Sequence, residues 1–246
     1  AYRPPWADAV PAASRGASDL YFGVYRTLPI LVYNTAVVSA ENAPSDWSQL
    51  LEPQFTGKLL MRDPVASGTL RTVFAMVLAQ SLAATGSEER GWQWLRRLDG
   101  QTKEYAANPA LLFEKLQRQE GWVTIWELSD ILLRQKQGVP LGFRLASSGT
   151  PVINDAIALV AGAPHAEAAQ AYIAWVGSRE AQLLAAREAY KLPARTDLAP
   201  GELPTWAQEA LAQLREAPLD GALVAQQAAG WMTTWDRTIR GRGTGS

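Results

Sequence analysis

The sequence predicts an α/β protein organised around a mostly parallel β-sheet. Short apolar runs with strand character alternate along the chain with longer stretches whose apolar residues recur at helical spacing. Strands that are joined through helices usually pair in parallel, and the helices then cover both faces of the sheet. The chain has 246 residues, of which 48% are hydrophobic and 19% charged. This composition can supply the core of one large domain or of two modest ones.

The strand candidates are apolar runs that follow an irregular, Pro- and Ala-rich start over 1–20. These runs cover 21–24, 28–33, 59–61, 122–126, 139–145 and 153–160. The run at 59–61 has the character of a buried strand, and Asp63-Pro64 stops it. The helical spacing that begins a few residues later predicts a strand, a tight loop and a helix in immediate succession.

The helix candidates begin at residues that cap helices. Asp46 and its neighbours open a short helix that Pro53 ends, and Ser67-Gly68-Thr69 opens a long one. Further helices are expected after Glu88, after Asn108-Pro109, after Glu127, and over 165–176, 178–188, 204–215 and 219–239. The Gly-rich stretch 241–246 is expected to form a flexible tail.

Charge and composition argue against several classes of function. The formal net charge is −1, with acidic and basic residues interspersed, so nothing indicates nucleic acid or an anionic membrane surface as a partner. The chain has no cysteine and one histidine, which removes disulfides, thiol catalysis and a Cys/His zinc site. We therefore expect neither a bound metal nor a cofactor. In addition, no apolar run approaches the roughly 20 residues that span a bilayer.

The loop Ser67-Gly68-Thr69 is the first candidate binding site. The first turn of a helix carries unpaired backbone N–H groups and a partial positive charge, and Ser and Thr add hydroxyl donors. Gly68 allows a ligand to approach the backbone closely. One interpretation is a cradle for a phosphate, phosphonate or carboxylate. The alternative is that Ser67 or Thr69 only caps the helix, as such residues commonly do.

A series of motifs occurs in a fixed order over most of the chain. The motifs are Trp47-x-x-Leu50-Leu51-x-Pro53, Gly57-Lys58, Asp63-Pro64-x-x-Ser67-Gly68-Thr69, Gly91-Trp92, Tyr105 to Asn108, and Gly149-Thr150-Pro151. This order resembles the solute-binding proteins of bacterial ABC importers. It is similar to the family 1 branch that handles ferric iron, phosphonates, sugar phosphates and polyamines.

The resemblance implies a type II periplasmic-binding-protein fold. Such proteins have two α/β lobes with mixed or parallel sheets, joined by crossing strands that are expected here at 24–34 and 141–152. One lobe is expected to contain 1–32 and 153–207, and the other 33–152 and 208–240. Relatives begin with a strand-helix-strand-helix-strand block that has no counterpart here. We therefore expect an incomplete first lobe, completed by a partner chain or by self-association.

The resemblance also points to Asn108, Trp126 and Glu127 as ligand-binding residues. Asn108 lies where iron-binding relatives hold an anion, although an Asn before Pro also forms turns. Those relatives carry adjacent tyrosines where this chain has Trp126-Glu127, so ferric iron is less favoured. An aromatic ring beside a carboxylate suits a solute that bears an amine, whereas a core tryptophan and a first-turn glutamate are the structural alternatives.

Three classes of function follow from these observations. The first is a periplasmic or extracellular protein, with a lipoprotein tether as one form, that binds a small anionic or zwitterionic solute in an inter-lobe cleft and delivers it to an ABC permease. Ferric iron and polyamines are alternative ligands. The second is the ligand-sensing domain of a receptor. The third is an enzyme that uses Ser67, which the absence of a nearby histidine or a Gly-x-Ser-x-Gly motif argues against.

Overall fold

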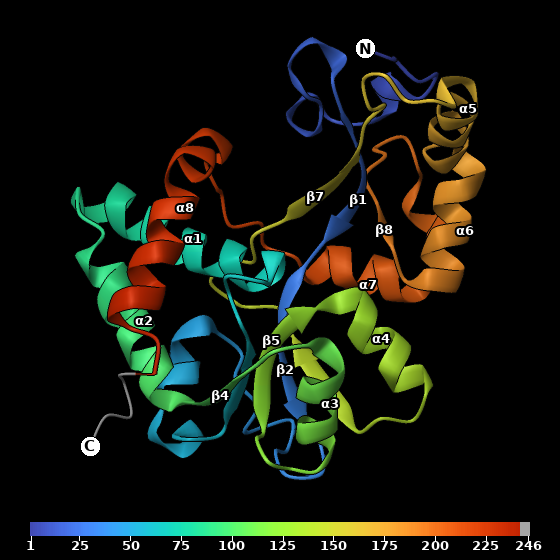
Figure 1. Cartoon of the computed structure of the whole chain (residues 1–246). Helices are drawn as coiled ribbons and strands as arrows, with labels where there is room; N and C mark the ends of the chain where they lie inside the picture. Colours follow the sequence, from blue (N-terminus) through green and yellow to red (C-terminus); the bar gives the residue numbers. More distant parts are fainter. Residues whose placement is uncertain (242–246) are drawn as a thin grey trace. The chain divides into compact units, whose positions relative to one another are not determined.

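The computed structural model describes residues 1–241, which form two compact units (Figure 1). Unit 1 contains Ala1–Leu28, Leu128–Leu133 and Val152–Gln213. Unit 2 contains Pro29–Glu127, Arg134–Pro151 and the chain from Leu214 to the end of the described residues. The expected lobe boundaries stay a prediction, and the expected tail lies, apart from Gly241, outside the described residues.

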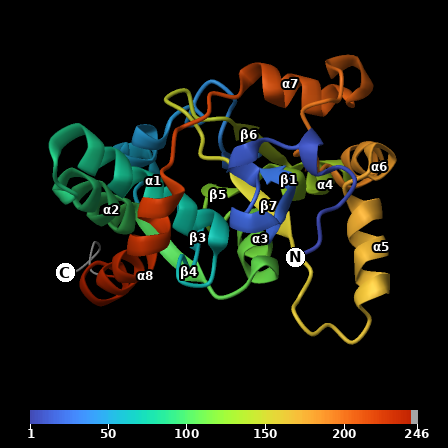
Figure 2. The ribbon, with the colours of Figure 1, turned by 90° about the horizontal axis from the view of Figure 1, so that it is seen from above.

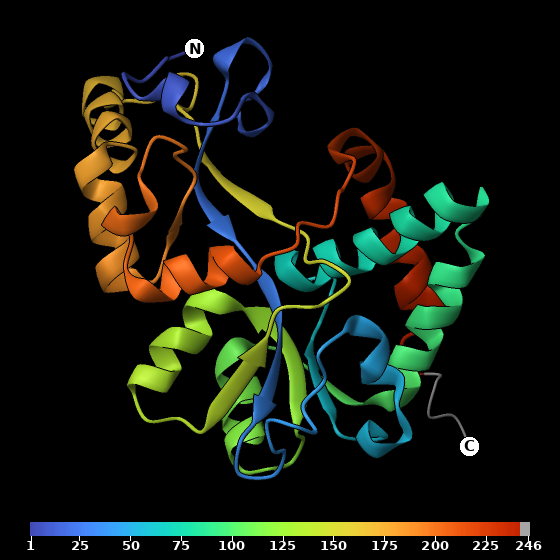
Figure 3. The ribbon, with the colours of Figure 1, turned by 180° about the vertical axis from the view of Figure 1, so that it is seen from behind.

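Unit 1 is built on a three-stranded antiparallel sheet. Strand β1 (Phe22–Thr27) lies between β7 (Ile153–Ile157) and the two-residue β8 (Leu192–Pro193). Figure 3 shows α5 and α6 following one another along one side of this unit. The helices of the unit are α5 (Ala166–Val176), α6 (Arg179–Ala189) and α7 (Thr205–Gln213).

The N-terminal segment supplies much of the core of unit 1. Trp6 is buried, stacks edge-on against Phe22 with ring centroids 5.8 Å apart, and donates its indole N–H to the Ile173 carbonyl at 2.9 Å. A Cβ at Gly177 would lie 2.0 Å from the Trp6 ring, which explains the glycine at this position. The segment expected to be irregular is therefore anchored by a buried aromatic side chain, with the short 3-10 helices Ala7–Ala9, Ala12–Ser14 and Ala17–Asp19.

Unit 2 is built on a five-stranded mixed sheet with the order β4-β3-β5-β2-β6. Strand β3 pairs in parallel with β4 and β5, whereas β2 pairs antiparallel with β5 and β6. The strands are β2 (Pro29–Asn34), β3 (Leu59–Arg62), β4 (Thr102–Ala106), β5 (Val123–Glu127) and β6 (Leu141–Arg144).

The helices of unit 2 pack around this sheet and around one another. Helices α1 and α2 pack together, and α8 lies against α1 (Figure 1). The bounds are α1 (Gly68–Thr85), α2 (Glu89–Gln101), α3 (Pro109–Gln117) and α8 (Gly221–Thr238), with the 3-10 helices Trp47–Leu51 and Pro53–Phe55. Helix α4 (Leu128–Lys136) follows β5, and its residues are divided between the units. No described helix is both long and apolar enough to cross a bilayer.

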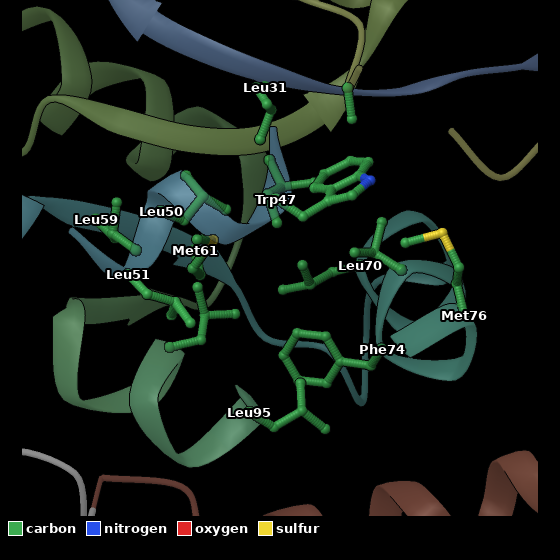
Figure 4. Close-up of a cluster of buried hydrophobic side chains, with 14 of the residues drawn as sticks. Leu31, Trp47, Leu50, Leu51, Leu59, Met61, Leu70, Phe74, Met76 and Leu95 are labelled. Carbon is green, nitrogen blue, oxygen red and sulfur yellow. The ribbon is translucent and has the colours of Figure 1, made fainter. Parts of the chain in front are cut away.

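The core of unit 2 forms where α1 and α2 meet the strands (Figure 4). Leu31 and Met61 from the sheet, Leu70 and Phe74 from α1, and Leu95 from α2 are almost completely buried. Their periodicity explains the elements, because apolar residues on one face of a helix must find an apolar partner. Burial of each such side chain contributes about 1.5–3 kcal/mol to folding.

The structure agrees with most elements expected from the sequence and corrects the sheet topology. Neither sheet is mostly parallel: the sheet of unit 1 is antiparallel and that of unit 2 is mixed. Alternation of strands and helices predicts parallel pairing only for strands joined through a helix. Strands β1 and β2 follow one another directly yet pair in different sheets. Strands β4 and β8 were not among the expected elements.

Asp46 caps the short helix Trp47–Leu51 and provides a pH-dependent prediction. Its carboxylate accepts hydrogen bonds from Ser147 Oγ at 2.8 Å and from the Ser148 amide at 2.6 Å, and also caps the Ser48 amide. Burial raises the pKa of Asp46, but these hydrogen bonds outweigh it and hold the pKa below its usual value.

A carboxyl group whose pKa is lowered by folding stabilises the protein above its unfolded pKa, and this contribution is lost as pH falls through the folded pKa. Asn can still cap the Ser48 amide, but its NH2 group cannot accept the hydrogen bonds from Ser147 and Ser148. We therefore expect Asp46→Asn to lower the free energy of unfolding by about 1 kcal/mol at neutral pH. The difference from the wild type should shrink as the medium becomes acidic. Urea unfolding across pH measures it, with the exposed Glu209→Gln as control. An effect that does not depend on pH would contradict the prediction.

Candidate functional site

The candidate residues lie at or just after the carboxyl ends of three neighbouring parallel strands in unit 2. Strand β3 leads into Ser67-Gly68-Thr69, β4 leads into Asn108, and β5 ends at Glu127. Because β3 pairs in parallel with both β4 and β5, these ends meet at one edge of the sheet. In α/β sheets this edge is where ligands bind.

Asp63 shapes the loop that precedes α1. Its side chain accepts a hydrogen bond from the Val65 amide at 2.9 Å, and its carbonyl accepts from the amides of Ala66 and Ser67 at 3.1 and 2.9 Å. Ser67 then caps the helix by accepting from the Leu70 amide at 3.3 Å. Ser67 therefore does cap the helix. This cap leaves the first two helical amides, those of Gly68 and Thr69, without an acceptor within the helix.

The turn is accessible to a small molecule. Gly68 is exposed, and an added Cβ would meet nothing within 4 Å. Ser67 and Thr69 are half-buried. The positive end of an 18-residue helix therefore faces open space at this position, which favours an anion there.

Two arginines flank this turn. Arg62 at the end of β3 donates from Nη1 to the carbonyls of Ala106 at 2.8 Å and of Ala107, and so ties the end of β3 to that of β4. Arg71, in the first turns of α1, places Nη1 3.5 Å from the Val65 carbonyl. Both add positive charge next to the helix start.

Asn108 acts as the cap of α3. Its side-chain oxygen accepts a hydrogen bond from the Leu111 amide at 2.9 Å, with Pro109 at the first position of the helix. Asn108 is exposed. Its side-chain oxygen is therefore engaged within its own helix, while the amide of the same side chain still provides a donor at the sheet edge.

Trp126 and Glu127 project to opposite faces of the sheet because successive side chains of a strand alternate. Trp126 is 8% exposed and packs edge-on against Phe113 of α3, with ring centroids 4.8 Å apart. Glu127 is half-buried and shares its face with Ile125, which packs in the core that contains α1. The structure thus brings Glu127 to the face of the sheet that α1 covers, and Trp126 to the face that α3 covers.

Tyr105 is the tyrosine closest in sequence to these residues, and it is held in its neutral form. Burial raises the pKa of its phenol, and the neighbouring Asp99 carboxylate, which accepts its hydrogen bond at 2.8 Å, raises it further. A phenol in this state donates a hydrogen bond and does not offer a phenolate oxygen. Within residues 1–241, no group of three or more His, Cys, Asp or Glu side chains is arranged to hold a metal ion.

Arg240 is a residue of the site that sequence reasoning missed. It follows the end of α8, and its guanidinium pairs with Asp63 at 2.9 Å and with Asp236 at 3.0 Å. Asp63 is the residue that shapes the loop before α1, so Arg240 connects α8 to that loop. No local pattern could reveal this pair, because its members are far apart in the sequence.

We expect Arg240→Ala to loosen the loop before α1 without unfolding the protein. A partly exposed ion pair contributes about 0–1 kcal/mol, so the change in overall stability should be small. Amide hydrogen exchange should become faster at Val65, Ala66 and Ser67, whose amides depend on Asp63. Arg237→Ala on the same helix is the matched control, because Arg237 makes no ion pair among the described residues. Unchanged exchange at these amides would contradict the prediction.

Comparison with known proteins shows the family of the chain. The family described as bacterial extracellular solute-binding protein matches residues 5–213. The chain belongs to this family. Its members are solute-binding proteins rather than enzymes and act outside the cytoplasm, in agreement with the location expected from the sequence.

Two curated relatives and one solved structure illustrate the likeness of this solute-binding protein. It is 25% identical over 242 residues to a "Probable ABC transporter periplasmic-binding protein" of Sinorhizobium fredii, covering 97% of this chain and 66% of that protein. It is 26% identical over 193 residues to a "Putative 2-aminoethylphosphonate-binding periplasmic protein" of Salmonella typhimurium, covering 76% of this chain and 55% of the relative.

The solved structure of the periplasmic binding protein AfuA from Actinobacillus pleuropneumoniae has a TM-score of 0.79 with 21% identity. The match covers 97% of this chain and 76% of AfuA. This likeness confirms the expected α/β periplasmic-binding-protein fold with mixed sheets. The chain spans 66% and 55% of the length of these two curated relatives.

Proposed function

We propose that this chain binds a small anionic or zwitterionic solute of the phosphonate or organophosphate kind, as the solute-binding component of an ABC importer. The observation that carries the proposal is the exposed start of α1 at the carboxyl edge of the sheet. Two amides of this turn lack acceptors within the helix, and the helix dipole favours negative charge beside them. A phosphonate or phosphate group matches these donors.

The neighbouring residues fit a zwitterion better than a simple anion. Glu127 lies on the face of the sheet that α1 covers and offers a carboxylate to an amine. Asn108 adds an amide donor at the same edge, and Trp126 supports the end of β5 through its contact with Phe113. The curated relative named for 2-aminoethylphosphonate supports this class of ligand, because that molecule carries both an amine and a phosphonate.

The proposal is tested by ligand-induced thermal stabilisation of the 246-residue chain. A ligand that binds only the folded state adds about 2.7 kcal/mol to the free energy of unfolding when its concentration is a hundred times its Kd. The melting temperature rises as a result. We expect 2-aminoethylphosphonate or a sugar phosphate to stabilise the chain, and spermidine and ferric citrate to have less effect. Calorimetry then measures the Kd. If none of these compounds stabilises the chain, the proposed function is wrong.

The proposed partners are the solute, an ABC permease and a polypeptide that completes lobe 1, with no nucleic acid. An imbalance in exposed apolar surface supports the last of these. Among the described residues, every strongly exposed large hydrophobic side chain except Val65 belongs to unit 1, and they include Tyr172 and Trp175 of α5. Strand β7 also has a neighbour on only one edge.

We therefore expect the purified chain to self-associate. Light scattering coupled to size-exclusion chromatography should report a mass above 26.8 kDa. Tyr172→Lys with Trp175→Lys should shift the equilibrium to the monomer, whereas Arg71→Gln in unit 2 should leave the mass unchanged. A well-folded wild-type monomer at all concentrations would contradict self-association.

A further inference from the structure

A groove of about 660 Å³ runs along α8 in unit 2, beside the beginning of α1. The two helices lie side by side in Figures 1 and 2. The floor is apolar and includes Val224, Ala228 and Met232 of α8, with Val65 from the loop before α1. A volume of this size is typical of sites for small organic ligands, which are lined mostly by apolar side chains with a few polar groups.

The floor of the groove is accessible from solvent. Val65 is 47% exposed. Among the described residues of unit 2, no other large hydrophobic side chain is strongly exposed. The small side chains on the α8 side, such as Ala225 and Ala229, leave room above the helix backbone. Covering an apolar surface with an apolar group is favourable by about 25 cal/mol for each Å² removed from water.

The polar groups of the groove are predominantly cationic. Arg71 and Arg237 line it, both are exposed, and neither is paired with a carboxylate among the described residues. The single acidic residue of the lining is Asp236, whose carboxylate is paired with Arg240 at 3.0 Å. The two guanidinium groups are therefore available for an anion, and guanidinium groups bind phosphate and carboxylate through paired N–H donors.

The geometry points to a binding site for an amphipathic organic anion in this groove. The apolar part of such a ligand would cover Val65, Ala228 and Met232, and its phosphate or carboxylate would pair with Arg71 and Arg237. An inorganic anion would leave the apolar floor uncovered, and a cationic amphiphile would place its charge beside two arginines. The lining does not include Ser67, Gly68, Thr69 or Glu127, so this inference does not rest on the proposed function.

The experiment uses octyl phosphate, below its micelle concentration, as the probe. Isothermal titration calorimetry on the wild-type chain should detect saturable binding, with no comparable signal from inorganic phosphate or octyltrimethylammonium. Arg71→Gln with Arg237→Gln should weaken octyl phosphate binding by about tenfold or more, because charge-assisted hydrogen bonds are lost. Arg97→Gln, an exposed arginine of α2 in the same unit, is the matched control and should bind as the wild type does.

Two further results decide the proposal. Ala228→Trp, which fills the groove from its floor, should also abolish octyl phosphate binding. The circular dichroism spectrum and the 2-aminoethylphosphonate response should stay those of the wild type. Absence of octyl phosphate binding, equal binding of the cationic amphiphile, or an unchanged Kd in the double arginine variant would each overturn the site. If octyl phosphate binds but neither 2-aminoethylphosphonate nor a sugar phosphate stabilises the wild type, the proposed function is overturned and this site is not.

Discussion

If the start of α1 holds the proposed anionic solute, Gly68→Pro is expected to weaken 2-aminoethylphosphonate binding strongly while leaving the fold intact. Gly68 is the first residue of α1, and proline is favoured at that position because its ring presets the helical backbone. Proline has no N–H, so the substitution removes one of the two amides proposed to hold the anion. Hydrogen bonds to a charged group contribute about 1.5–3 kcal/mol, which corresponds to roughly a tenfold to hundredfold rise in the Kd of 2-aminoethylphosphonate.

The local geometry allows this substitution. Ser67 has φ −107° and ψ 111°, an extended conformation that is compatible with a following proline. Gly68→Ala is the matched control, because it adds a Cβ into open space and keeps the N–H. Titration calorimetry compares the three proteins, and urea unfolding confirms that each is folded. If Gly68→Pro binds as tightly as Gly68→Ala, the amide of residue 68 does not hold the solute.

Helix starts were the features that the sequence predicted best, because a cap is a local interaction. Asp46, Ser67, Asn108 and Ser178 each accept a hydrogen bond from an amide two or three residues further along the chain. The residue type and its position relative to the apolar periodicity are enough to recognise such a start. For the same reason the loop at 67–69 was predicted as the junction between a buried strand and a helix.

Strand pairing could not be predicted to the same extent, because it depends on neighbours that are distant in the sequence. Strand β4 has the sequence Thr-Lys-Glu-Tyr-Ala, which is neither an apolar run nor an alternating pattern, and its stability comes from pairing with β3. The antiparallel placement of β2 between β5 and β6 likewise has no local signal. The family resemblance implied mixed or parallel sheets, whereas the strand–helix pattern alone favoured parallel pairing.

The candidate site shows the same division between local and distant effects. The loop at 67–69 was recognised from its own residues, and Asn108, Trp126 and Glu127 followed from the family resemblance. The parallel pairing of β3, β4 and β5 then brings these segments to one edge of the sheet. The faces to which Trp126 and Glu127 project could have been derived from strand alternation. The Arg240–Asp63 pair could not, because it depends on where the end of α8 meets the loop before α1.

Trp235→Ala is expected to produce the largest loss of stability. Trp235 of α8 is fully buried and packs edge-on against Phe74 of α1 and Tyr105 of β4, with centroid distances of 5.6 and 5.1 Å. It therefore joins three elements of unit 2. Truncation removes a large buried ring and leaves a cavity that the neighbouring rings cannot close, which costs about 3–5 kcal/mol. Equilibrium urea unfolding followed by far-ultraviolet circular dichroism measures this loss.

Trp235→Phe separates the packing contribution of the ring from that of its N–H group. The indole N–H of Trp235 is buried without a hydrogen-bond partner among the described residues, so its removal relieves an unsatisfied donor. Phenylalanine keeps an aromatic ring against Phe74 and Tyr105, and we expect a loss of about 1 kcal/mol or less. A loss equal to that of Trp235→Ala would show that the indole N–H is satisfied in solution, because the smaller cavity alone does not account for so large a cost.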